Sequence, residues 1–327
     1  MTQPRRAVVK GGEGVYHCIS RCVRRAHLCG FDKLTGKSFD HRKEWVRARL
    51  QQLVEIFCIE LLSYSLMGNH QHTLLRTRVD RLAMLTDREV AHRWLLLYPK
   101  EVVIEKGVLR PSAKALDELA SNTERISELR VRLGSISWFM KSFAEYIARR
   151  ANQEDECKGS FWEGRFKCSA VEGEAAMLAC SIYIDLNPIR AAIADTPETS
   201  EFTSAWERIR SLHGQLAEIG EPPIWLAPLA STPERRGFLS LTLLEYLSLL
   251  DTTGREMRKG KRGRIPAQLN PILERIGLRA DAWLNASENL EKLFCAHIGH
   301  EKKLKQIAAI QSKRWVRGIR SARKVFI

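Results

Sequence analysis

Two histidines separated by a single residue stand in the stretch "YSLMGNHQHTLL", residues 64–75. The stretch is typical of a strand, and alternate residues of a strand share one face. His70 and His72 are therefore expected to project together, with Gln71 on the opposite face. Two imidazoles on one face can chelate a divalent metal ion if one or two more ligands join them. The alternative is a plain pair of surface histidines, which the spacing alone favours.

A second pair of polar groups lies in "YIDLNP", residues 183–188. Residues four apart on a helix lie one above the other, so Tyr183 and Asn187 are expected to project together from a last turn. A phenol and an amide oxygen placed side by side could act on one substrate. The alternative is a half-buried core tyrosine followed by an asparagine cap ahead of Pro188, and the residues alone favour it.

A third stretch, "FWEGRFK" at residues 161–167, interleaves aromatic and basic side chains. This mixture suits single-stranded DNA, because bases stack on rings while phosphates pair with cations. A strand with one apolar and one solvated face is an equally good interpretation. The residues that the first interpretation assigns to DNA are Trp162, Arg165 and Lys167.

The elements that must position these groups follow from hydrophobic spacing. Strand patterns cover residues 15–22, 59–67 and 70–76, and Gly68-Asn69 between the last two is a hairpin signal. Apolar residues at helical spacing mark residues 40–57 and 135–152. Residues 159–171 predict a turn and a strand, and residues 172–186 predict a helix that stops near Pro188. Residues 77–133 are charged and mostly helical, which predicts an insertion packed beside the sheet.

The order β-α-β-β-α-β-α predicts an α+β fold with a split βαβ (ferredoxin/RRM-like) antiparallel sheet and helices on one face. After about residue 200 the pattern is helical, with Pro-rich joints such as "GEPPIWLAP". We therefore expect two domains: residues 1–205, which hold the histidines and the tyrosine, and an α-helical C-terminal domain, residues 206–327.

The charge of the chain indicates a polyanionic partner. Its 327 residues include 53 Lys and Arg against 38 acids, a net charge of +15. Nucleic acid is the first candidate and an anionic membrane surface the second. The longest apolar window, residues 238–250, is shorter than a membrane span and contains Glu245, so no membrane partner is expected. The start lacks an apolar signal segment, so we expect a cytoplasmic location.

Basic residues gather in the last third of the chain. Residues 300–327 contain nine Lys or Arg and one acid, and "REMRKGKRGR" at residues 255–264 adds six more basic residues. Such runs are commonly just solvated, but two of them in one small domain favour contact with DNA phosphates. The spacing near the end predicts an amphipathic helix with a basic stripe, which we expect to contact DNA: Lys313, Arg317, Arg320 and Lys324.

Taken together, three motifs resemble the single-tyrosine HUH transposases, and most closely their REP-associated tyrosine transposase branch. They are "MGNHQH" after a strand, "SFWEGRFK", and a helix ending in "YIDLNPIR", in the order typical of the family over about residues 14–195. The resemblance implies a metal-dependent single-strand DNA endonuclease and strand transferase that forms a 5′-phosphotyrosine. The expected partner is single-stranded or hairpin DNA with palindromic repeats, and the expected assembly is a monomer or a homodimer.

The resemblance also implies a role for each site residue. His70 and His72 match the two histidines that hold Mg²⁺ or Mn²⁺, and Asn187 matches a third, polar ligand. Tyr183 matches the nucleophile. The chain departs from the family at Gln71, since the residue between the two histidines is usually bulky and apolar.

Three rival hypotheses stay open. The chain could be a non-catalytic DNA-binding regulator that keeps the HUH fold, although the complete set of histidines, tyrosine and asparagine argues against this. It could bind or process RNA, which a comparison of DNA and RNA oligonucleotides would reveal. It could also be a metal phosphohydrolase without a covalent step, in which case Tyr183→Phe would keep activity. No stretch resembles a Walker loop or GxGxxG, so no nucleotide cofactor is expected.

Overall fold

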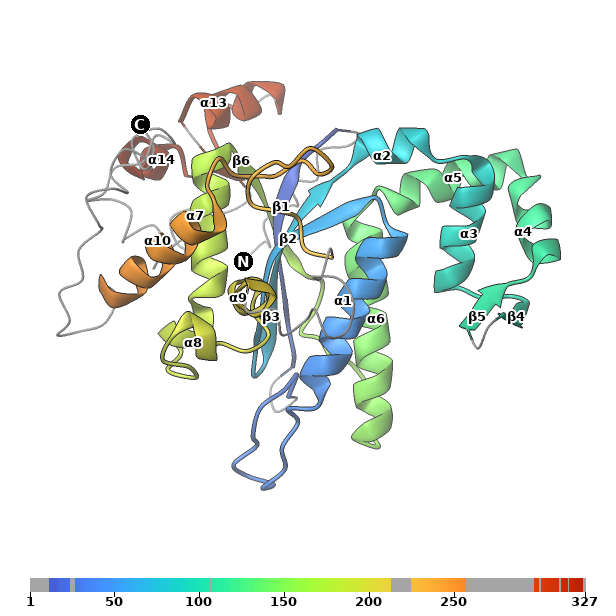
Figure 1. Ribbon diagram of the computed structural model, residues 1–327, viewed down its shortest axis with the longest axis horizontal. Helices are drawn as coiled ribbons and strands as arrows, with labels where there is room; N and C mark the ends of the chain where they lie inside the picture. The colour runs from blue at the N-terminus through green and yellow to red at the C-terminus, as the bar shows by residue number, and fades with distance from the viewer. Residues whose placement is uncertain are drawn as a thin grey trace.

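The structure is a computed structural model, shown in Figure 1, that describes residues 12–23, 27–105, 108–212, 225–256, 297–299, 301–311, 313–316 and 318–325. Its strands are β1 (Val15–Arg21), β2 (Ile59–Met67), β3 (His70–Thr77), β4 (Val102–Glu105), β5 (Val108–Pro111), β6 (Lys167–Glu172) and β7 (His297–Gly299). Its helices are α1 (Arg42–Ile56), α2 (Val79–Met84), α3 (Asp87–Leu97), α4 (Ala113–Ala120), α5 (Thr123–Leu133), α6 (Ile136–Glu154), α7 (Glu174–Asp185), α8 (Asn187–Arg190), η1 (Pro197–Thr199), α9 (Ser204–Leu212), α10 (Leu243–Glu256), α13 (Glu301–Ile310) and α14 (Ile319–Val325).

The main sheet has the strand order β2-β3-β1-β6-β7. The first four strands are antiparallel to their neighbours, and β7 runs parallel to β6. Strands β2 and β3 form the predicted hairpin around Gly68 and Asn69. The α+β class and the split βαβ strand order expected from the sequence are therefore confirmed.

The two crossover helices cover the same face of this sheet (Figure 1). Helix α1 connects β1 to β2, and α6 precedes β6. Val46 and Leu50 of α1 lie in one hydrophobic core with Phe139 of α6 and with Tyr16 and Leu75 of the sheet. This apolar contact is the main stabilisation of the layer, because burial of such side chains drives helix-on-sheet packing. The expectation of helices on one face holds for these crossovers.

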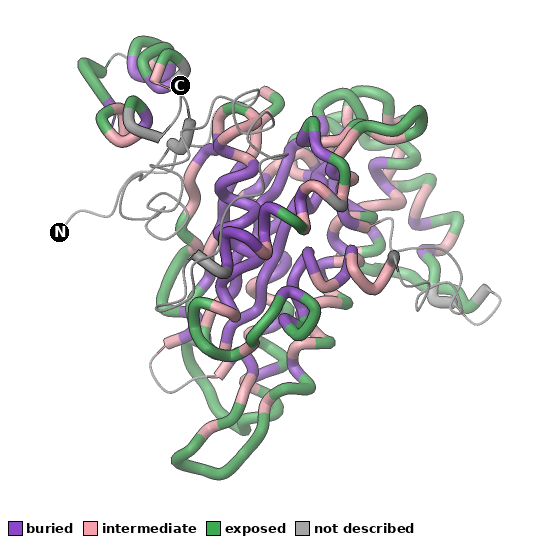
Figure 2. Tube along the Cα trace, turned by 60° about the vertical axis from the view of Figure 1, so that its left-hand side comes forward, coloured by how far each residue is buried: buried purple, intermediate pink, exposed green. Residues whose placement is uncertain are grey.

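Helix α7 corrects that expectation, because it covers the opposite face. Leu178 and Ile182 of α7 share a second core with Leu62, Leu74 and Val171 of the sheet. Nine of the twelve residues of α7 are buried, so the helix needs cover on more than one side. The sheet supplies one side and α10 another, as Figure 1 shows, and the buried residues in Figure 2 extend through both layers.

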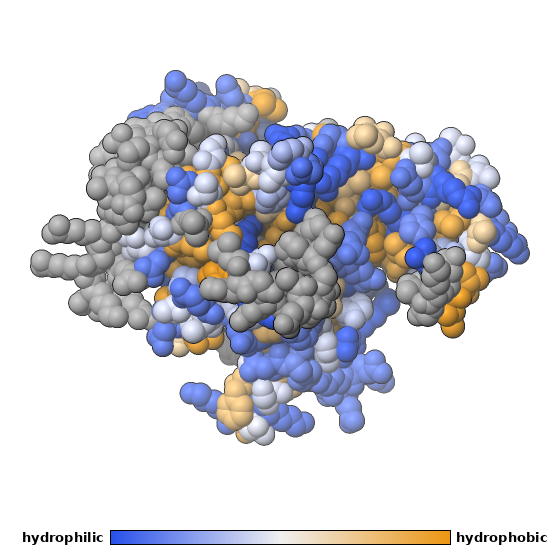
Figure 3. Space-filling view, in the orientation of Figure 1, coloured by the Kyte–Doolittle hydropathy of each residue, from blue (hydrophilic) through white to orange (hydrophobic). Residues whose placement is uncertain are grey.

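The predicted insertion, residues 77–133, contains α2, α3, the β4–β5 hairpin, α4 and α5. It lies beside the layer of α1 and α6, at the end of the molecule remote from α7 (Figure 1). The hairpin is the part that the sequence pattern missed. It exposes Val102, Val103 and Ile104, and hydrophobic colour marks this end of the molecule in Figure 3.

The described residues after 205 pack into the same cores as the rest of the chain, and the expected separate domain of residues 206–327 stays a prediction. Tyr246, Leu249 and Leu250 of α10 lie in the same core as α7. Strand β7 extends the main sheet beside β6. Within the described ranges, no helix is both long and apolar enough to cross a membrane.

Helix α9 makes hydrogen bonds to both α1 and β2. Glu207 accepts hydrogen bonds from Arg47 of α1 at 2.5 Å and from the Tyr64 hydroxyl of β2 at 2.7 Å. Arg208, which is also buried, donates to the backbone oxygen of Leu62 at 2.7 Å. Buried charges need partners of this kind, so α9 is held in one position against both faces of the sheet edge.

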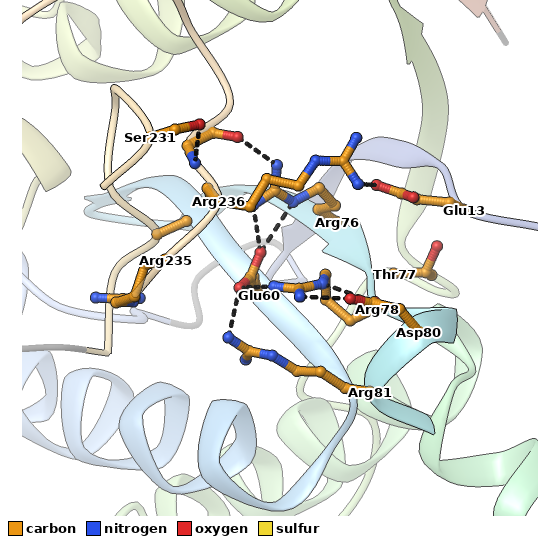
Figure 4. A network of polar contacts seen from close by, with 12 residues as sticks. Glu13, Glu60, Arg76, Thr77, Arg78, Asp80, Arg81, Ser231, Arg235 and Arg236 are labelled. Carbon is orange, nitrogen blue, oxygen red and sulfur yellow. Dashed lines mark hydrogen bonds and ion pairs between the residues drawn. The ribbon is translucent and has the colours of Figure 1, made fainter. Parts of the chain in front are cut away.

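A second polar network lies at the end of β2 and β3 remote from their hairpin turn (Figure 4). The buried Glu60 carboxylate accepts hydrogen bonds from Arg76 and Arg78 and pairs with Arg81 at 3.1 Å. Arg76 also donates to the backbone oxygens of Arg236 and Gly237, both at 2.8 Å. The network therefore holds the segment before α10 against the sheet.

Candidate active site

Strand β3 carries the two histidines on the face covered by α7. Their ring centroids are 5.0 Å apart. Leu74, two residues beyond His72 on the same strand face, packs in the core with α7, which fixes the face to which all three side chains belong. The strand alternation seen in the sequence thus places both imidazoles on one side of the sheet.

Helix α7 brings Tyr183 to these histidines. The ring centroids of Tyr183 and His72 are 5.7 Å apart, with the rings nearly perpendicular. The approach depends on Gly173, whose φ of 90° turns the chain sharply from β6 into α7. Only 7% of Tyr183 is exposed.

A third histidine, His17 of β1, completes an aromatic cluster that the sequence did not reveal. Its Nε2 lies 3.0 Å from Nδ1 of His72, and the two rings stack at 5.2 Å. The ring of Tyr183 lies 6.0 Å from that of His17. The alternation of side chains along β1 could have indicated which face His17 takes. Only the register of β1 and β3, in which His17 lies diagonally opposite His72, shows that the two side chains are neighbours.

Neighbouring groups orient the two β3 imidazoles. Nδ1 of His70 lies 2.7 Å from Oδ1 of Asn69, which can only accept, so this nitrogen carries the proton. Nδ1 of His72 is engaged by His17. Each imidazole can therefore offer Nε2 to a metal ion, provided that His72 donates its Nδ1 proton to His17.

Burial keeps His72 in the form that a metal needs. Removal from water lowers the pKa of His72 well below the usual range, and the neighbouring His17 and His70 lower it further. Two nearby cations, Arg190 and Arg21, act in the same direction. A neutral imidazole is the ligating form, so the environment and the proposed ligation agree.

Asn187 follows Tyr183 by one helical turn, beyond a break in the helix. Helix α7 ends at Asp185, Leu186 joins it to α8, and Pro188 stands in the first turn of α8. Asn187 is buried, and its Nδ2 has no hydrogen-bond partner among the described residues. The amide oxygen, not this nitrogen, is the atom that could serve as a third metal ligand.

The donor set that fits a divalent ion is Nε2 of His70 and His72 with the amide oxygen of Asn187. No group of three or more His, Cys, Asp or Glu side chains in the described ranges is placed to hold a metal. Two imidazoles leave ligand positions open on a divalent ion, and the amide oxygen of Asn187 is the candidate for one of them. Imidazole and amide oxygen are both ordinary ligands of divalent first-row metals.

Asp185 anchors the end of the helix that carries the tyrosine. It accepts hydrogen bonds from the Ser204 hydroxyl at 2.6 Å, the Ala205 amide at 3.0 Å and the Tyr246 hydroxyl at 2.6 Å. Burial raises the pKa of the Asp185 carboxyl, against the opposing effect of Arg208 and these donors. The contacts fix α7 against α9 and α10.

Three exposed cations border the imidazoles on this face. The Arg190 guanidinium lies 4.6 Å from the centroid of the Tyr183 ring. Arg21 is paired in register with His70. Lys167 is paired with Ile19, and strand alternation places it on the face of His17. Such a rim suits the phosphates of a nucleic acid. Of the three, only Lys167 was selected from the sequence.

The other two predicted contacts in "FWEGRFK" differ from each other in exposure. Arg165 is exposed, whereas Trp162 is buried and donates from Nε1 to the backbone oxygen of Ala144 at 2.8 Å. The ring of Trp162 is therefore not exposed on the outer surface, where a base could stack on it. Both residues border a cavity that lies on the α6 face of the sheet.

The predicted stripe of four tail cations on one helix is wrong. Helix α13 ends at Ile310, and the amide of Lys313 bonds back to the oxygen of Ala308 at 2.8 Å, a helix-ending contact. Gly318, with a φ of 107°, then precedes α14. Lys313 and Arg320 are exposed and remain predicted DNA contacts. Arg317, the side chain of Lys324 and residues 257–264 of the basic run lie outside the described residues.

Comparisons with known proteins add one similar structure. No protein-family model and no curated protein matches the chain. A solved structure of a REP-associated tyrosine transposase bound to a REP hairpin is similar at 13% identity, over 73% of this chain and 100% of that chain, with a TM-score of 0.35. A likeness this distant assigns neither family nor function, and both depend on the site described above.

Proposed function

We propose that the protein is a metal-dependent single-strand DNA endonuclease and strand transferase of the HUH type. The observation that carries this proposal is the convergence of His70 and His72 from β3 with Tyr183 from α7, the three residues that the family resemblance selects. The net charge of +15 supports a DNA partner, which we propose to be single-stranded or hairpin DNA bound by a monomer or a homodimer.

In the proposed reaction, the Tyr183 hydroxyl attacks the phosphorus of a phosphodiester. A bond forms between the tyrosine oxygen and phosphorus while the bond from phosphorus to the 3′-oxygen breaks. The phenol proton ends on the released 3′-hydroxyl, and the 5′-phosphate stays on the tyrosine. Strand transfer is the same exchange in reverse with another 3′-hydroxyl, so no nucleotide cofactor is consumed.

The remaining residues position the phosphate. His70, His72 and Asn187 would hold Mg²⁺ or Mn²⁺, which when bound polarises a phosphate and offsets its developing negative charge. Arg190 beside the Tyr183 ring would stabilise the same charge. Arg21 and Lys167 would hold neighbouring phosphates along the strand.

The test is capture of the covalent intermediate. The protein is incubated with Mn²⁺ and a pool of single-stranded hairpin oligonucleotides labelled at the 3′ end, because the fragment kept by the tyrosine carries the 5′-phosphate. A labelled protein band on a denaturing gel is expected for the parent protein and for the control Tyr98→Phe. The band should be lost in Tyr183→Phe. An adduct that survives Tyr183→Phe would overturn the assignment of the nucleophile.

The burial of Tyr183 favours a second candidate function. Only 7% of its surface is exposed, and Asp185 pins the helix that carries it. A DNA-binding regulator that keeps the fold without cleavage would show these features. It would bind the same oligonucleotides and form no adduct with Mg²⁺ or Mn²⁺.

A further inference from the structure

A cavity of about 600 Å³ lies on the face of the sheet opposite the candidate active site. It forms between α6, the end of β1 and the loop before β6. Its charged lining residues are Lys141, Arg165 and one acid, Glu145, and its aromatic ones are Trp138, Trp162 and Phe166, with the hydroxyl of Ser20 at the end of β1. Its size is ordinary for a small-molecule or nucleotide pocket.

The cavity is at the same end of the sheet as the histidines. Ser20 precedes Arg21, which is paired in register with His70, and Trp162 bridges to Cys22 just beyond. Alternation along β1 turns Ser20 toward α6 and Arg21 toward α7. A strand bound at Tyr183 would have to pass round this end of the sheet to place one of its bases in the cavity.

The walls of the cavity combine aromatic rings with cations. The hydrogen bond from Trp162 to Ala144 and an edge contact with Phe161 at 5.0 Å fix the indole as a rigid wall. Lys141 lies 4.5 Å from the ring centroid of Trp138, and Arg165 is exposed at the rim. Stacking surfaces beside positive charge are what single-stranded DNA requires.

Gln71 is a polar residue next to the cavity, although its side chain is not part of the lining. It is directly opposite Ser20 in the β1–β3 pairing, and it is fully buried. Among the described residues, neither its Oε1 nor its Nε2 has a hydrogen-bond partner. A buried amide without partners is costly, which favours a polar partner beyond the described residues. A carboxamide can pair with the donor and acceptor on the edge of a base.

We propose that this cavity binds one nucleobase of the single-stranded DNA substrate. Trp162 and Phe166 stack on the base, Ser20 contacts its edge, and Lys141 and Arg165 hold the adjoining phosphates. The amide of Gln71, which is not part of the lining, reaches the base edge when its side chain turns past Ser20 into the cavity. The inference rests on the proposed function in one respect, the single-stranded DNA substrate. It explains why a polar residue stands between the two histidines, on the face that they do not use.

The experiment separates base contacts from phosphate contacts. Fluorescence anisotropy measures the binding of homopolymers of deoxyadenosine, deoxycytidine or thymidine, and of an abasic strand of equal length and charge. The protein carries Tyr183→Phe so that no cleavage intervenes. We expect at least one homopolymer to bind about tenfold or more tightly than the abasic strand, since stacking of one base has that order of effect.

Variants then locate the base contact. Ala148→Phe, which fills the cavity from α6, should reduce that ratio to about threefold or less and leave abasic binding unchanged. Gln71→Leu should change the order of preference among the homopolymers without lowering the melting temperature. Arg165→Ala should weaken all strands more than Lys158→Ala, an exposed control outside the cavity lining.

Equal binding of all strands by the parent protein would overturn the inference. So would a ratio and an order of preference that persist in both Ala148→Phe and Gln71→Leu. These outcomes are independent of the adduct test. A covalent adduct with base-independent binding would sink only the cavity proposal, and base-dependent binding without an adduct would sink only the catalytic one.

Discussion

Nε2 of His17 lies 3.0 Å from Nδ1 of His72, across two neighbouring strands and 55 residues of sequence. This contact leaves Nε2 of His72 as its ligating atom. It also resembles, in kind, the outer hydrogen bond that a metal-bound histidine usually makes. We therefore expect His17 to position His72 if the candidate site binds a metal, and no motif indicated this residue.

Replacing His17 tests that role. His17→Phe should raise the Mn²⁺ concentration needed for half-maximal adduct formation by about 10- to 100-fold, because removal of an outer hydrogen bond typically has this effect on metal affinity. Saturating Mn²⁺ should restore most of the adduct. The control is His92→Phe on α3, remote from the site. An unchanged Mn²⁺ requirement in His17→Phe would show that the contact has no bearing on the metal.

Asp185 gives a pH-dependent prediction. Because its pKa is raised in the folded protein, folding binds a proton, and this carboxyl contributes less stability as pH rises above about 4. The stability of the parent relative to Asp185→Asn should therefore fall as pH rises above about 4. Urea unfolding at several pH values measures it.

The matched control for Asp185→Asn is the removal of one exposed carboxylate, Asp195→Asn. A difference between parent and Asp185→Asn that grows with pH would mean that the carboxyl is stabilised in its charged form by its three donors. That result would contradict the dominant effect of burial.

The Glu60 network predicts a large decrease in stability. Glu60→Ala leaves Arg76 and Arg78 largely buried without their shared carboxylate, so the free energy of unfolding should fall by about 3–5 kcal/mol. Asp80→Ala removes a more exposed partner of Arg78 and should cost about 1 kcal/mol or less. Denaturant unfolding measures both variants. Equal decreases would mean that burial gives Glu60 no larger contribution to stability than the exposed Asp80.

The cation rim gives a prediction about salt. The double variant Arg190→Ala with Lys167→Ala should weaken DNA binding across sequences. It should also reduce the log–log salt slope by roughly 0.7–0.9 for each phosphate that the protein no longer neutralises. The control pair, Arg88→Ala with Lys114→Ala, removes the same charge from the exposed insertion. If both pairs change the slope equally, the net charge of the protein alone sets the salt dependence, and Arg190 and Lys167 make no specific phosphate contacts.

The sequence by itself determined the local features of this protein. Strand alternation predicted that His70 and His72 share a face, because side-chain direction repeats every two residues whatever the strand packs against. Turn chemistry at Gly68 and Asn69 predicted the hairpin, and apolar spacing predicted the strands and helices. The charge surplus indicated the class of partner. Side-chain alternation, turn chemistry and apolar spacing depend on neighbours a few residues away, whereas the strand order was inferred from the order of the elements and the charge from composition.

Only the tertiary structure decided what the local elements meet. Side-chain alternation could not predict the register that places His17 beside His72. Nor could it predict which face of the sheet α7 covers. Both depend on the burial of segments that lie far apart in the sequence. The tail was mispredicted for the same reason. Its spacing predicted one continuous helix, but the hydrogen bond from Lys313 to Ala308 and the positive φ of Gly318 interrupt it. The same reason explains the shared core of α7 and α10 as well. A sequence pattern states which side of an element is apolar, and the fold selects the surface that covers it.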